Sequence, residues 1–246
     1  MKRIMILGAT SAIATACARL WAADGGRFFL VGRDAEKLWQ VAADLSARGA
    51  SEAHVHVLDL TRVADHHTLF EHGFAALGAV DIALLAHGIL SDQALCQSDV
   101  GAAVREFETN ATSVIALLTE LGVRLSAARA GTIAVISSVA GDRGRASNYP
   151  YGAAKAAVTA FSAGLRARLY PVGVHVLTIK PGPVATPMTA GMRLPGLLVA
   201  TPEQVARDIV GAVRAGKGTL YTPWFWRPIM VIIRAMPEAI LRRLPL

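Results

Sequence analysis

Short apolar runs recur along the chain, and each is followed by a loop and then by a longer segment with helical periodicity. Short apolar runs bounded by turn residues are typical of buried strands, and longer periodic segments are typical of helices. Repeated alternation of strand and helix favours a parallel sheet with helices on both faces. We therefore predict an α/β fold built on a single doubly wound parallel sheet. The predicted strands cover residues 3–7, 27–31, 54–58, 81–86, 133–136, 174–179 and 218–222.

Residues with distinctive chemistry follow the ends of these predicted strands. In open α/β sheets, ligands bind outside the carboxyl ends of the strands. Convergence at this one edge predicts a single site there. The residues that follow strand ends are Gly8, Arg33, Asp59, Gly88, Ser138 and Gly182.

The first loop, Gly-Ala-Thr-Ser-Ala-Ile-Ala over residues 8–14, connects a strand to an apolar helix. Backbone N–H groups and a helix N-terminus in such a loop face the pyrophosphate of a dinucleotide. Gly8 can take a backbone conformation that other residues avoid, and Thr10 and Ser11 can donate hydroxyl groups. Only one of the expected glycines is present, so a tight turn without a ligand is the alternative.

The end of the second strand carries the residues that choose between cofactors. An acidic residue there binds a ribose 2′-hydroxyl and favours NAD(H), whereas an arginine pairs with a 2′-phosphate. Arg33 therefore indicates NADP(H), and NAD(H) is the less favoured choice. Asp34 follows directly and has a second possible role, as N-cap of a helix over residues 35–48. Asp59, after the third strand, can accept a hydrogen bond from an adenine amino group.

A Tyr–Lys pair supplies the candidate chemistry. Tyr151 and Lys155 lie four residues apart at the start of an Ala-rich helix, so they share one face. A nearby ammonium lowers the pKa of a phenol, and Ser138 at a strand end can hydrogen-bond a carbonyl oxygen. Together they suit the reduction of a ketone or the oxidation of an alcohol by general acid–base catalysis. The pair alone is common on helices; the upstream serine and the first loop favour catalysis.

Two further segments bear on this site. Asn110 falls inside a predicted long helix over residues 98–128, where it is either solvated, satisfied locally, or holding a water that relays protons to Lys155. The loop Pro-Gly-Pro-Val-Ala-Thr over residues 181–186 can contact a nicotinamide amide and a phosphate. Residues 188–200 are rich in Gly, Met, Leu and Pro and predict a mobile lid over the substrate.

With these motifs the chain resembles the short-chain dehydrogenase/reductase family over nearly its full length. The glycine motif of the family is matched only in part, because this chain has alanine at positions 12 and 14. The sequence Leu-Ala-His-Gly over residues 85–88 stands where the family has Asn-Asn-Ala-Gly. The resemblance implies a Rossmann-like fold, a homodimer or homotetramer, and catalytic roles for Asn110, Ser138, Tyr151 and Lys155. It implies cofactor contacts from Gly8, Thr10, Ser11, Ala12, Ile13, Arg33, Asp59, Leu60, Ala86, Gly88, Tyr151, Lys155, Pro181, Gly182, Val184 and Thr186.

The substrate is left open by the sequence. The first loop, the Gly-Arg-Asp at residues 32–34 and the Trp-Phe-Trp-Arg-Pro at residues 224–228 resemble, more loosely, the decaprenylphosphoryl-keto-sugar 2-reductase branch of the family. The apolar lid and tail favour an apolar or lipid-linked ketone, either an acyl-carrier-bound 3-ketone or a polyprenyl-phosphate keto-sugar. Arg143 and Arg145 either bind a substrate phosphate or lie on a solvated surface or interface. A non-catalytic NADP-binding sensor or membrane scaffold is the second hypothesis, motivated by the altered glycines.

Composition and charge limit the partners, the cellular compartment and the metal sites that we expect for the protein. A net charge of +7 is compatible with anionic partners, but the basic residues are scattered, so we expect no nucleic-acid partner. The two cysteines, Cys17 and Cys96, form no disulfide framework, which indicates a reduced, cytoplasmic setting. We expect no metal site, with the histidines at positions 66, 67 and 72 solvated on a polar helix.

The last part of the chain differs from the rest. Residues 1–222 are predicted to form the catalytic domain, and residues 223–246 an apolar and basic C-terminal segment. A hydrophobic content of 53% and a mean hydropathy of +0.43 fit a large core, an apolar interface or membrane contact. The segment is too short in apolar residues to span a bilayer. It either lies in a membrane surface, which would make the protein peripheral at an inner membrane face, or packs on the domain or a partner subunit.

Overall fold

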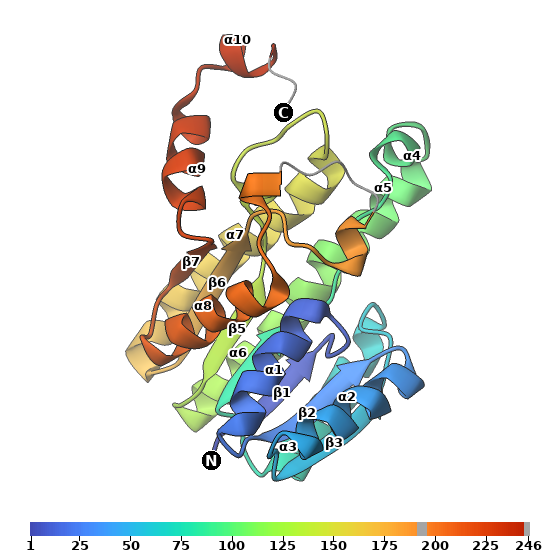
Figure 1. The fold of residues 1–246 in the computed structure, drawn as a ribbon, viewed down its shortest axis with the longest axis vertical. Coiled ribbons are helices and arrows are strands. Elements are labelled where there is room, and N and C mark those ends of the chain that lie inside the picture. The colour runs from blue at the N-terminus through green and yellow to red at the C-terminus, as the bar shows by residue number, and fades with distance from the viewer. Residues whose placement is uncertain (191–195, 244–246) are drawn as a thin grey trace.

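A seven-stranded sheet forms the centre of the protein, as seen in the computed structural model, which describes residues 1–190 and 196–243 (Figure 1). Its strand order is β3-β2-β1-β4-β5-β6-β7, and every neighbouring pair runs parallel. This confirms the predicted doubly wound α/β fold. The strands are β1 (Arg3–Leu7), β2 (Arg27–Gly32), β3 (Glu52–Val57), β4 (Ile82–Leu85), β5 (Thr132–Ile136), β6 (His175–Pro181) and β7 (Thr219–Thr222).

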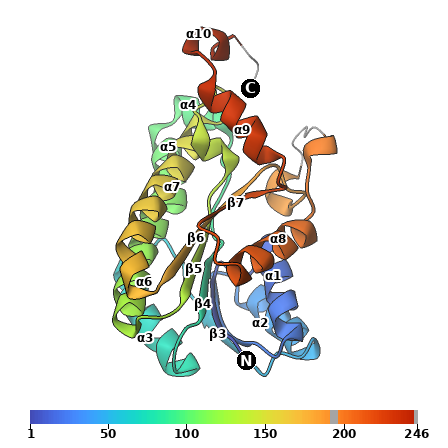
Figure 2. The same ribbon diagram turned by 90° about the vertical axis from the view of Figure 1, so that its left-hand side faces the viewer.

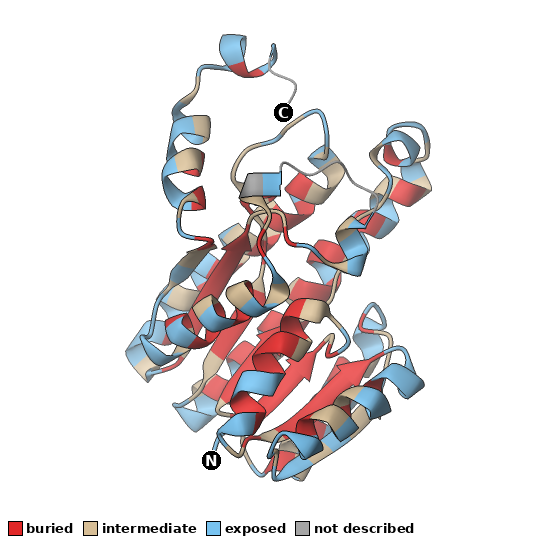
Figure 3. Ribbon diagram, in the orientation of Figure 1, coloured by how far each residue is buried: buried red, intermediate tan, exposed pale blue. Residues whose placement is uncertain are grey.

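Helices cover both faces of this sheet (Figure 2). One face carries α1 (Ala12–Ala23), α2 (Ala35–Ala47) and α8 (Pro202–Arg214); the other carries α3 (His66–Leu77), α6 (Ser113–Ala128) and α7 (Tyr149–Leu169). Each face has its own apolar cluster, and the inner strands are buried along their length (Figure 3). The shorter helices are α4 (Gln93–Ser98), α5 (Val100–Phe107), α9 (Trp226–Ala235) and α10 (Glu238–Leu241), with 3₁₀ turns at Val63–Asp65, Val139–Asp142, Tyr170–Val172, Pro187–Thr189 and Gly196–Leu198 and a π turn at Glu108–Thr112.

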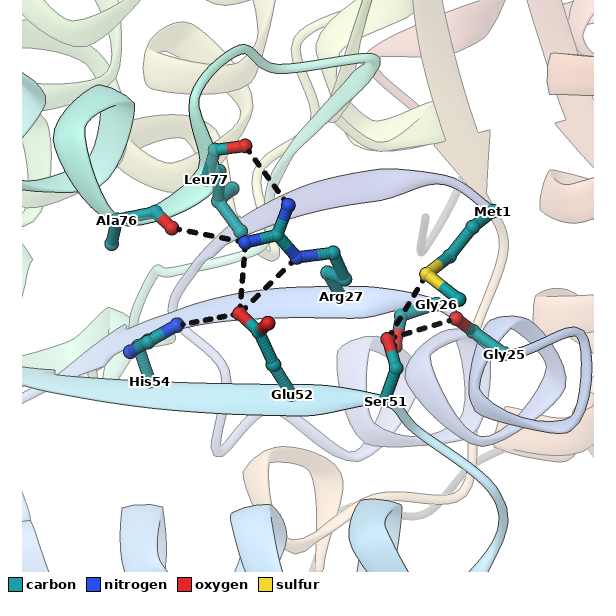
Figure 4. A network of polar contacts seen from close by, with 9 residues as sticks. All are labelled: Met1, Gly25, Gly26, Arg27, Ser51, Glu52, His54, Ala76 and Leu77. Carbon is teal, nitrogen blue, oxygen red and sulfur yellow. Dashed lines mark hydrogen bonds and ion pairs between the residues drawn. The ribbon is translucent and has the colours of Figure 1, made fainter.

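The amino end of the sheet is held by charged groups, as Figure 4 shows around Arg27. The guanidinium of Arg27 contacts Glu52 on β3 at 2.8 Å and donates to the carbonyl oxygens of Ala76 and Leu77 at the end of α3. Glu52 in turn lies 3.1 Å from the ring of His54. These contacts tie β2, β3 and α3 together at the end of the sheet opposite the predicted site.

Two expectations about individual elements need correction. The third strand begins at Glu52 and ends at Val57, because Glu52 pairs in register with Arg27 at the start of β2. His66 is buried rather than solvated, since its Nε2 lies 2.9 Å from the carbonyl oxygen of Leu60. His67 and His72 are exposed as expected.

The predicted long helix over residues 98–128 is divided. A separate short helix α4 ends at Ser98, and residues 100–128 then form α5, the π turn and α6 in succession. By length and composition alone, residues 100–128 would suffice to cross a membrane, with a mean hydropathy of 1.3 in their most apolar window. Leu117, Leu118 and Leu121 of α6 are completely buried in the core, so this helix is accounted for by its packing inside the fold.

The C-terminal segment extends away from the sheet as α9 and α10 (Figures 1 and 2). Trp226 and Met230 are buried in a small cluster with Val139, whereas other apolar side chains of the segment are exposed. These exposed residues are Trp224, Val231, Ile232 and Ile240. The division of the chain at residue 222 stays a prediction. The predicted lid over residues 188–200 falls partly, at 191–195, outside the described residues.

Gly8 provides a test of the close approach between β1 and β4. Its φ is +91°, and a Cβ at this position would lie 2.5 Å from the backbone nitrogen of His87. We expect Gly8→Ala to lower the free energy of unfolding by about 3 kcal/mol or more, from left-handed strain plus overpacking. Gly25→Ala is the matched control, because φ is +75° there with open space around it; strain alone should cost about 1–2 kcal/mol. Equal losses in urea denaturation would refute the steric argument.

Candidate active site

A cavity of about 960 Å³ runs along the carboxyl edge of the sheet. Parallel strands place their following loops at this edge, so residues far apart in sequence meet there. Every residue that the sequence nominated for catalysis or for cofactor contact lines this cavity, although what each one does stays a prediction. They are Gly8, Thr10, Ser11, Ala12, Ile13, Arg33, Asp59, Leu60, Ala86, Gly88, Asn110, Ser138, Tyr151, Lys155, Pro181, Gly182, Val184 and Thr186.

Helix α7 brings Tyr151 and Lys155 to the cavity. Pro150 lies in its first turn, where the missing N–H of a proline costs no helical hydrogen bond. Lys155 is 4% exposed, and its Nζ donates to the carbonyl oxygen of Ile136 at 3.1 Å. The same Nζ lies 5.6 Å from the ring centroid of Tyr151. The ammonium is therefore fixed between the end of β5 and the phenol.

The turn after β5 packs closely on α7. A Cβ at Gly141 would lie 2.6 Å from the backbone of Lys155, so only glycine permits this approach. Ser138 precedes that turn, and its Oγ accepts from the N–H of Ala140 at 3.1 Å. Ser138 and Tyr151 both line the cavity, and the Ser138 side chain is the one group that acts to lower the pKa of the Tyr151 phenol. The serine and the tyrosine thus face one point in the cavity.

Desolvation controls the proton affinities of the pair. Burial raises the pKa of Tyr151 to about 12, although the hydrogen bond from Ser138 opposes this rise. Burial lowers the pKa of Lys155 to about 8, and the negative charge of Glu106 opposes that fall. From the sequence we expected Lys155 to lower the pKa of the phenol; in the structure desolvation is the largest effect on this pKa, and it acts in the opposite direction.

Asn110 is fully buried within the π turn. Its Oδ1 accepts from the N–H of Ile89 at 3.1 Å, and its Nδ2 donates to the Ile89 carbonyl at 2.9 Å and to Glu106 at 2.5 Å. Of the three expectations for this residue, local satisfaction by protein groups describes its side chain. A Cβ at Gly88 would lie 2.5 Å from Asn110 Oδ1 and 3.7 Å from Lys155 Nζ, which places the asparagine beside the lysine.

Glu106 is a buried carboxylate that the sequence analysis missed. It is 1% exposed, and its second oxygen accepts from the N–H of Ser91 at 2.9 Å. Both oxygens therefore accept hydrogen bonds, one from the loop after β4 and one from Asn110. The signal that could have identified it is its position one helical turn before Asn110.

The other end of the cavity is formed by the first loop and by the residues that follow β4. Gly8 brings the backbone of the first loop against that of residues 86–87, and the Ser11 side chain makes no capping hydrogen bond on α1. Burial lowers the pKa of His87 to about 3, so its ring is neutral; Nε2 lies 2.8 Å from Ser113 Oγ. Its Nδ1 is buried and without a hydrogen-bond partner among the described residues. A buried polar atom of this kind suits a polar ligand.

Of the charged side chains at this end, Asp34 caps a helix, whereas Arg33 and Asp59 line the cavity. The side chain of Asp34 accepts from Lys37 N–H at 3.1 Å and so caps α2. Arg33 lines the cavity and takes part in no ion pair within the described part of the chain. Burial would raise the pKa of Asp59, but hydrogen bonds from Thr61 and the charge of Arg33 lower it overall. The one acidic residue of the Gly-Arg-Asp sequence, Asp34, is thus already engaged as a helix cap.

The loop after β6 is supported from behind by a buried ion pair. Lys180 Nζ lies 2.5 Å from Asp142 Oδ1, and the Tyr221 hydroxyl donates to the other oxygen of Asp142 at 2.6 Å. Gly182 follows, and Trp226 of α9 packs where a Cβ at that position would lie. These contacts join the turn after Ser138 to the predicted cofactor loop and to the C-terminal segment.

Comparisons with known proteins agree with this geometry. Residues 2–195 match the family model described as short chain dehydrogenase. A protein of Mycobacterium tuberculosis named an uncharacterized oxidoreductase is 39% identical over 98% of this chain and 96% of its own length. A Streptomyces coelicolor protein, named likewise, is 37% identical over 99% of this chain and 96% of its own.

Solved structures show the same fold. A short chain dehydrogenase/reductase family protein superposes with a TM-score of 0.77 at 30% identity, covering 89% of this chain and 94% of its own. A variant of actinorhodin polyketide ketoreductase, solved with NADPH, superposes with a TM-score of 0.80 at 23% identity, covering 90% of this chain and 95% of its own. None of these names the keto-sugar reductase branch, which stays a prediction.

The contacts of Glu106 predict that it contributes to the stability of the fold and to the pKa of Lys155. Glu106→Gln leaves one hydrogen-bond donor of the loop or of Asn110 facing an amide group, which should lower the free energy of unfolding by about 1–3 kcal/mol. Loss of its charge should also move the pKa of Lys155 further below about 8, because that charge now raises it. Urea denaturation and an NMR titration of the Lys155 side chain measure the two effects.

Glu108→Gln is the matched control for this prediction. Glu108 is exposed at the start of the π turn, two residues after Glu106 on α5, so the identical chemical change there should leave both quantities close to those of the unmodified protein. Equal effects of the two substitutions would show that Glu106 has no special coupling to the site.

Proposed function

Because the chain belongs to the short-chain dehydrogenase/reductase family, we propose that it is an NADP(H)-dependent oxidoreductase that interconverts a ketone and a secondary alcohol. The observation that carries this proposal is the meeting of Asn110, Ser138, Tyr151 and Lys155 in one cavity with the Gly8 loop. The family uses nicotinamide cofactors and acts on small-molecule substrates. The choice of NADP(H) rests on Arg33, since Asp34 is engaged as a helix cap.

The cofactor would lie along the cavity from Arg33 to Lys155. Arg33 would pair with the 2′-phosphate, Asp59 would contact the adenine, and the loop with Gly8, Thr10 and Ser11 would hold the pyrophosphate. Residues 181–186 would contact the nicotinamide end. When bound, the nicotinamide supplies or accepts the hydride.

The protein's own residues would handle the proton. In ketone reduction, Tyr151 would donate its phenolic proton to the carbonyl oxygen while Ser138 hydrogen-bonds that same oxygen. The ammonium of Lys155 would stabilise the phenolate that remains, and Asn110 with Glu106 would hold the loop that borders the lysine. A pKa near 12 keeps Tyr151 protonated and ready to donate at neutral pH.

Apolar residues in the cavity and on the surface support proposals about the substrate, the oligomeric state and membrane contact. Ile89, Leu90 and Val139 line the cavity near the tyrosine, which suits an apolar or lipid-linked ketone. Exposed apolar side chains on α5, at Val100 and Val104, suit a homodimer or homotetramer. The exposed apolar residues of α9 and α10 suit a peripheral position at the inner face of a membrane, with the domain in the cytoplasm.

Tyr151→Phe tests the reaction. Loss of the general acid should lower the rate of ketone-dependent NADPH oxidation by about 10²–10⁴-fold, measured spectrophotometrically across a panel of ketones. Tyr149→Phe is the matched control, because this exposed tyrosine lies two residues earlier on the same helix; it should leave the rate within about twofold. A Tyr151→Phe enzyme with normal turnover would remove the proposed role. No NADPH oxidation by the unmodified protein would favour the non-catalytic binding hypothesis.

Arg33→Asp tests the cofactor choice. Replacing the guanidinium with a carboxylate removes the partner of a 2′-phosphate and repels it, so the ratio of NADPH to NADH affinity should fall by about 100-fold or more. Calorimetric titration of both cofactors measures this ratio. Arg207→Asp makes the same change of charge on an exposed part of α8 and should leave the ratio unchanged. An unchanged ratio in Arg33→Asp would contradict the role of Arg33.

A further inference from the structure

Three polar side chains at the substrate end of the cavity hold buried atoms that have no hydrogen-bond partner among residues 1–190 and 196–243. They are Gln93 Nε2 on α4, and Arg145 Nε and Asn148 Oδ1 on the segment between β5 and α7. All three residues line the same cavity as Tyr151. Buried polar groups in folded proteins are almost always paired, so such groups on a cavity wall suit a polar ligand.

Arg145 differs from its neighbour Arg143, which has an identical side chain two residues away. Arg143 contacts Glu238 of α10 at 2.6 Å, so its charge is neutralised within the fold. Arg145 takes part in none of the ion pairs formed by residues 1–190 and 196–243. Burial lowers the pKa of Arg145, with no carboxylate to oppose it. A partly buried guanidinium without a partner is unfavourable and gains most from binding an anion.

The carboxylates that line this end of the cavity are engaged elsewhere. Asp92 caps α4 by accepting from the N–H of Ala94 at 2.7 Å. Glu106 accepts from Ser91 and Asn110 through its two oxygens. Neither lies within ion-pair distance of Arg145, so an incoming anion meets no competing carboxylate from the described part of the chain.

The topology separates this arginine from the one proposed for the cofactor. Arg33 follows β2 and Arg145 follows β5, and β1 and β4 lie between these strands in the sheet. Two arginines therefore line one cavity from different ends of the site. An anion held by Arg145 would belong to the second reactant and lie on the Ser138 side.

We propose that Arg145 and Gln93 bind an anionic group, a carboxylate or a phosphate ester, carried by the ketone substrate, and that Asn148 accepts a hydrogen bond from an O–H or N–H group beside it. This inference rests on the proposed function, because it names the substrate class for that site. A guanidinium and a primary amide both donate to anion oxygens, and the guanidinium can do so with two parallel hydrogen bonds.

Binding measurements with matched ketones test the proposal. The carboxylate pair is 5-oxohexanoate and its methyl ester; the phosphate pair is dihydroxyacetone phosphate and dihydroxyacetone. Each compound is titrated calorimetrically into the full chain, with and without saturating NADP⁺, so that no turnover is needed. We expect the anionic member of at least one pair to bind about 10- to 100-fold more tightly than its neutral partner. Which pair shows the preference identifies the anion.

Substitutions assign that preference to Arg145. Arg145→Met should remove most of the preference without weakening the neutral ketone, and Arg145→Lys should retain part of it. Arg143→Met is the matched control and should keep the full preference, because that residue is neutralised by Glu238. A thermal unfolding scan of each variant confirms that it is folded.

Two results would overturn the assignment. Either the anionic and neutral ketones bind equally to the unmodified protein, or the preference survives in Arg145→Met. Failure of the proposed function would be distinguishable, because it would show as absent hydride transfer from NADPH while the binding preference persisted.

Discussion

An ammonium group removed from water is the constraint around which this site is arranged. Lys155 is 4% exposed, and its Nζ has the Ile136 carbonyl as its recorded hydrogen-bond acceptor. Burying a charge is unfavourable unless other groups compensate it. The compensation comes from the end of β5, from Glu106 through space, and from the face of the Tyr151 ring. Gly88 and Gly141 lack side chains, which leaves room for the groups that surround this lysine.

A second buried lysine, Lys180, has an ammonium charge that is fully compensated by neighbouring groups. Lys180 on β6 has Asp142 at 2.5 Å, and Tyr221 donates to the same carboxylate. That triad is a closed network, so its polar atoms are occupied within the fold. Lys155 is left incompletely compensated beside an open cavity, which is the condition expected of a group with a shifted pKa in a functional site. The contrast separates a lysine that supports the loops from one that faces a ligand.

The sequence predicted the sheet and the lining of the cavity because both depend on chain order. Apolar runs locate the strands, and in a parallel sheet the residues that follow the strands share one edge. The sequence could therefore predict that Gly8 and Ser138 lie at the same edge. Glu106 and the difference between Arg143 and Arg145 could not be predicted, because they depend on neighbours from other parts of the chain. Glu106 accepts from the N–H of Ser91, and Arg143 pairs with Glu238, 95 residues later. The burial of His66, whose ring lies 2.9 Å from the carbonyl oxygen of Leu60, depends on how the loop after β3 folds.

The π turn at Glu108–Thr112 has a consequence for the helix on either side of it. Positions 100, 104, 107, 111, 114, 118 and 121 have the spacing of one apolar stripe, yet the first three are exposed and the last four buried. An extra residue in the turn rotates the two halves by about 100° relative to each other. As a result, the apolar side chains of α5 face outward, and the carboxylate of Glu106 faces inward, where it accepts a hydrogen bond from the amide of Asn110. A helical wheel drawn without that extra residue would misplace Glu106 relative to the cavity that it lines.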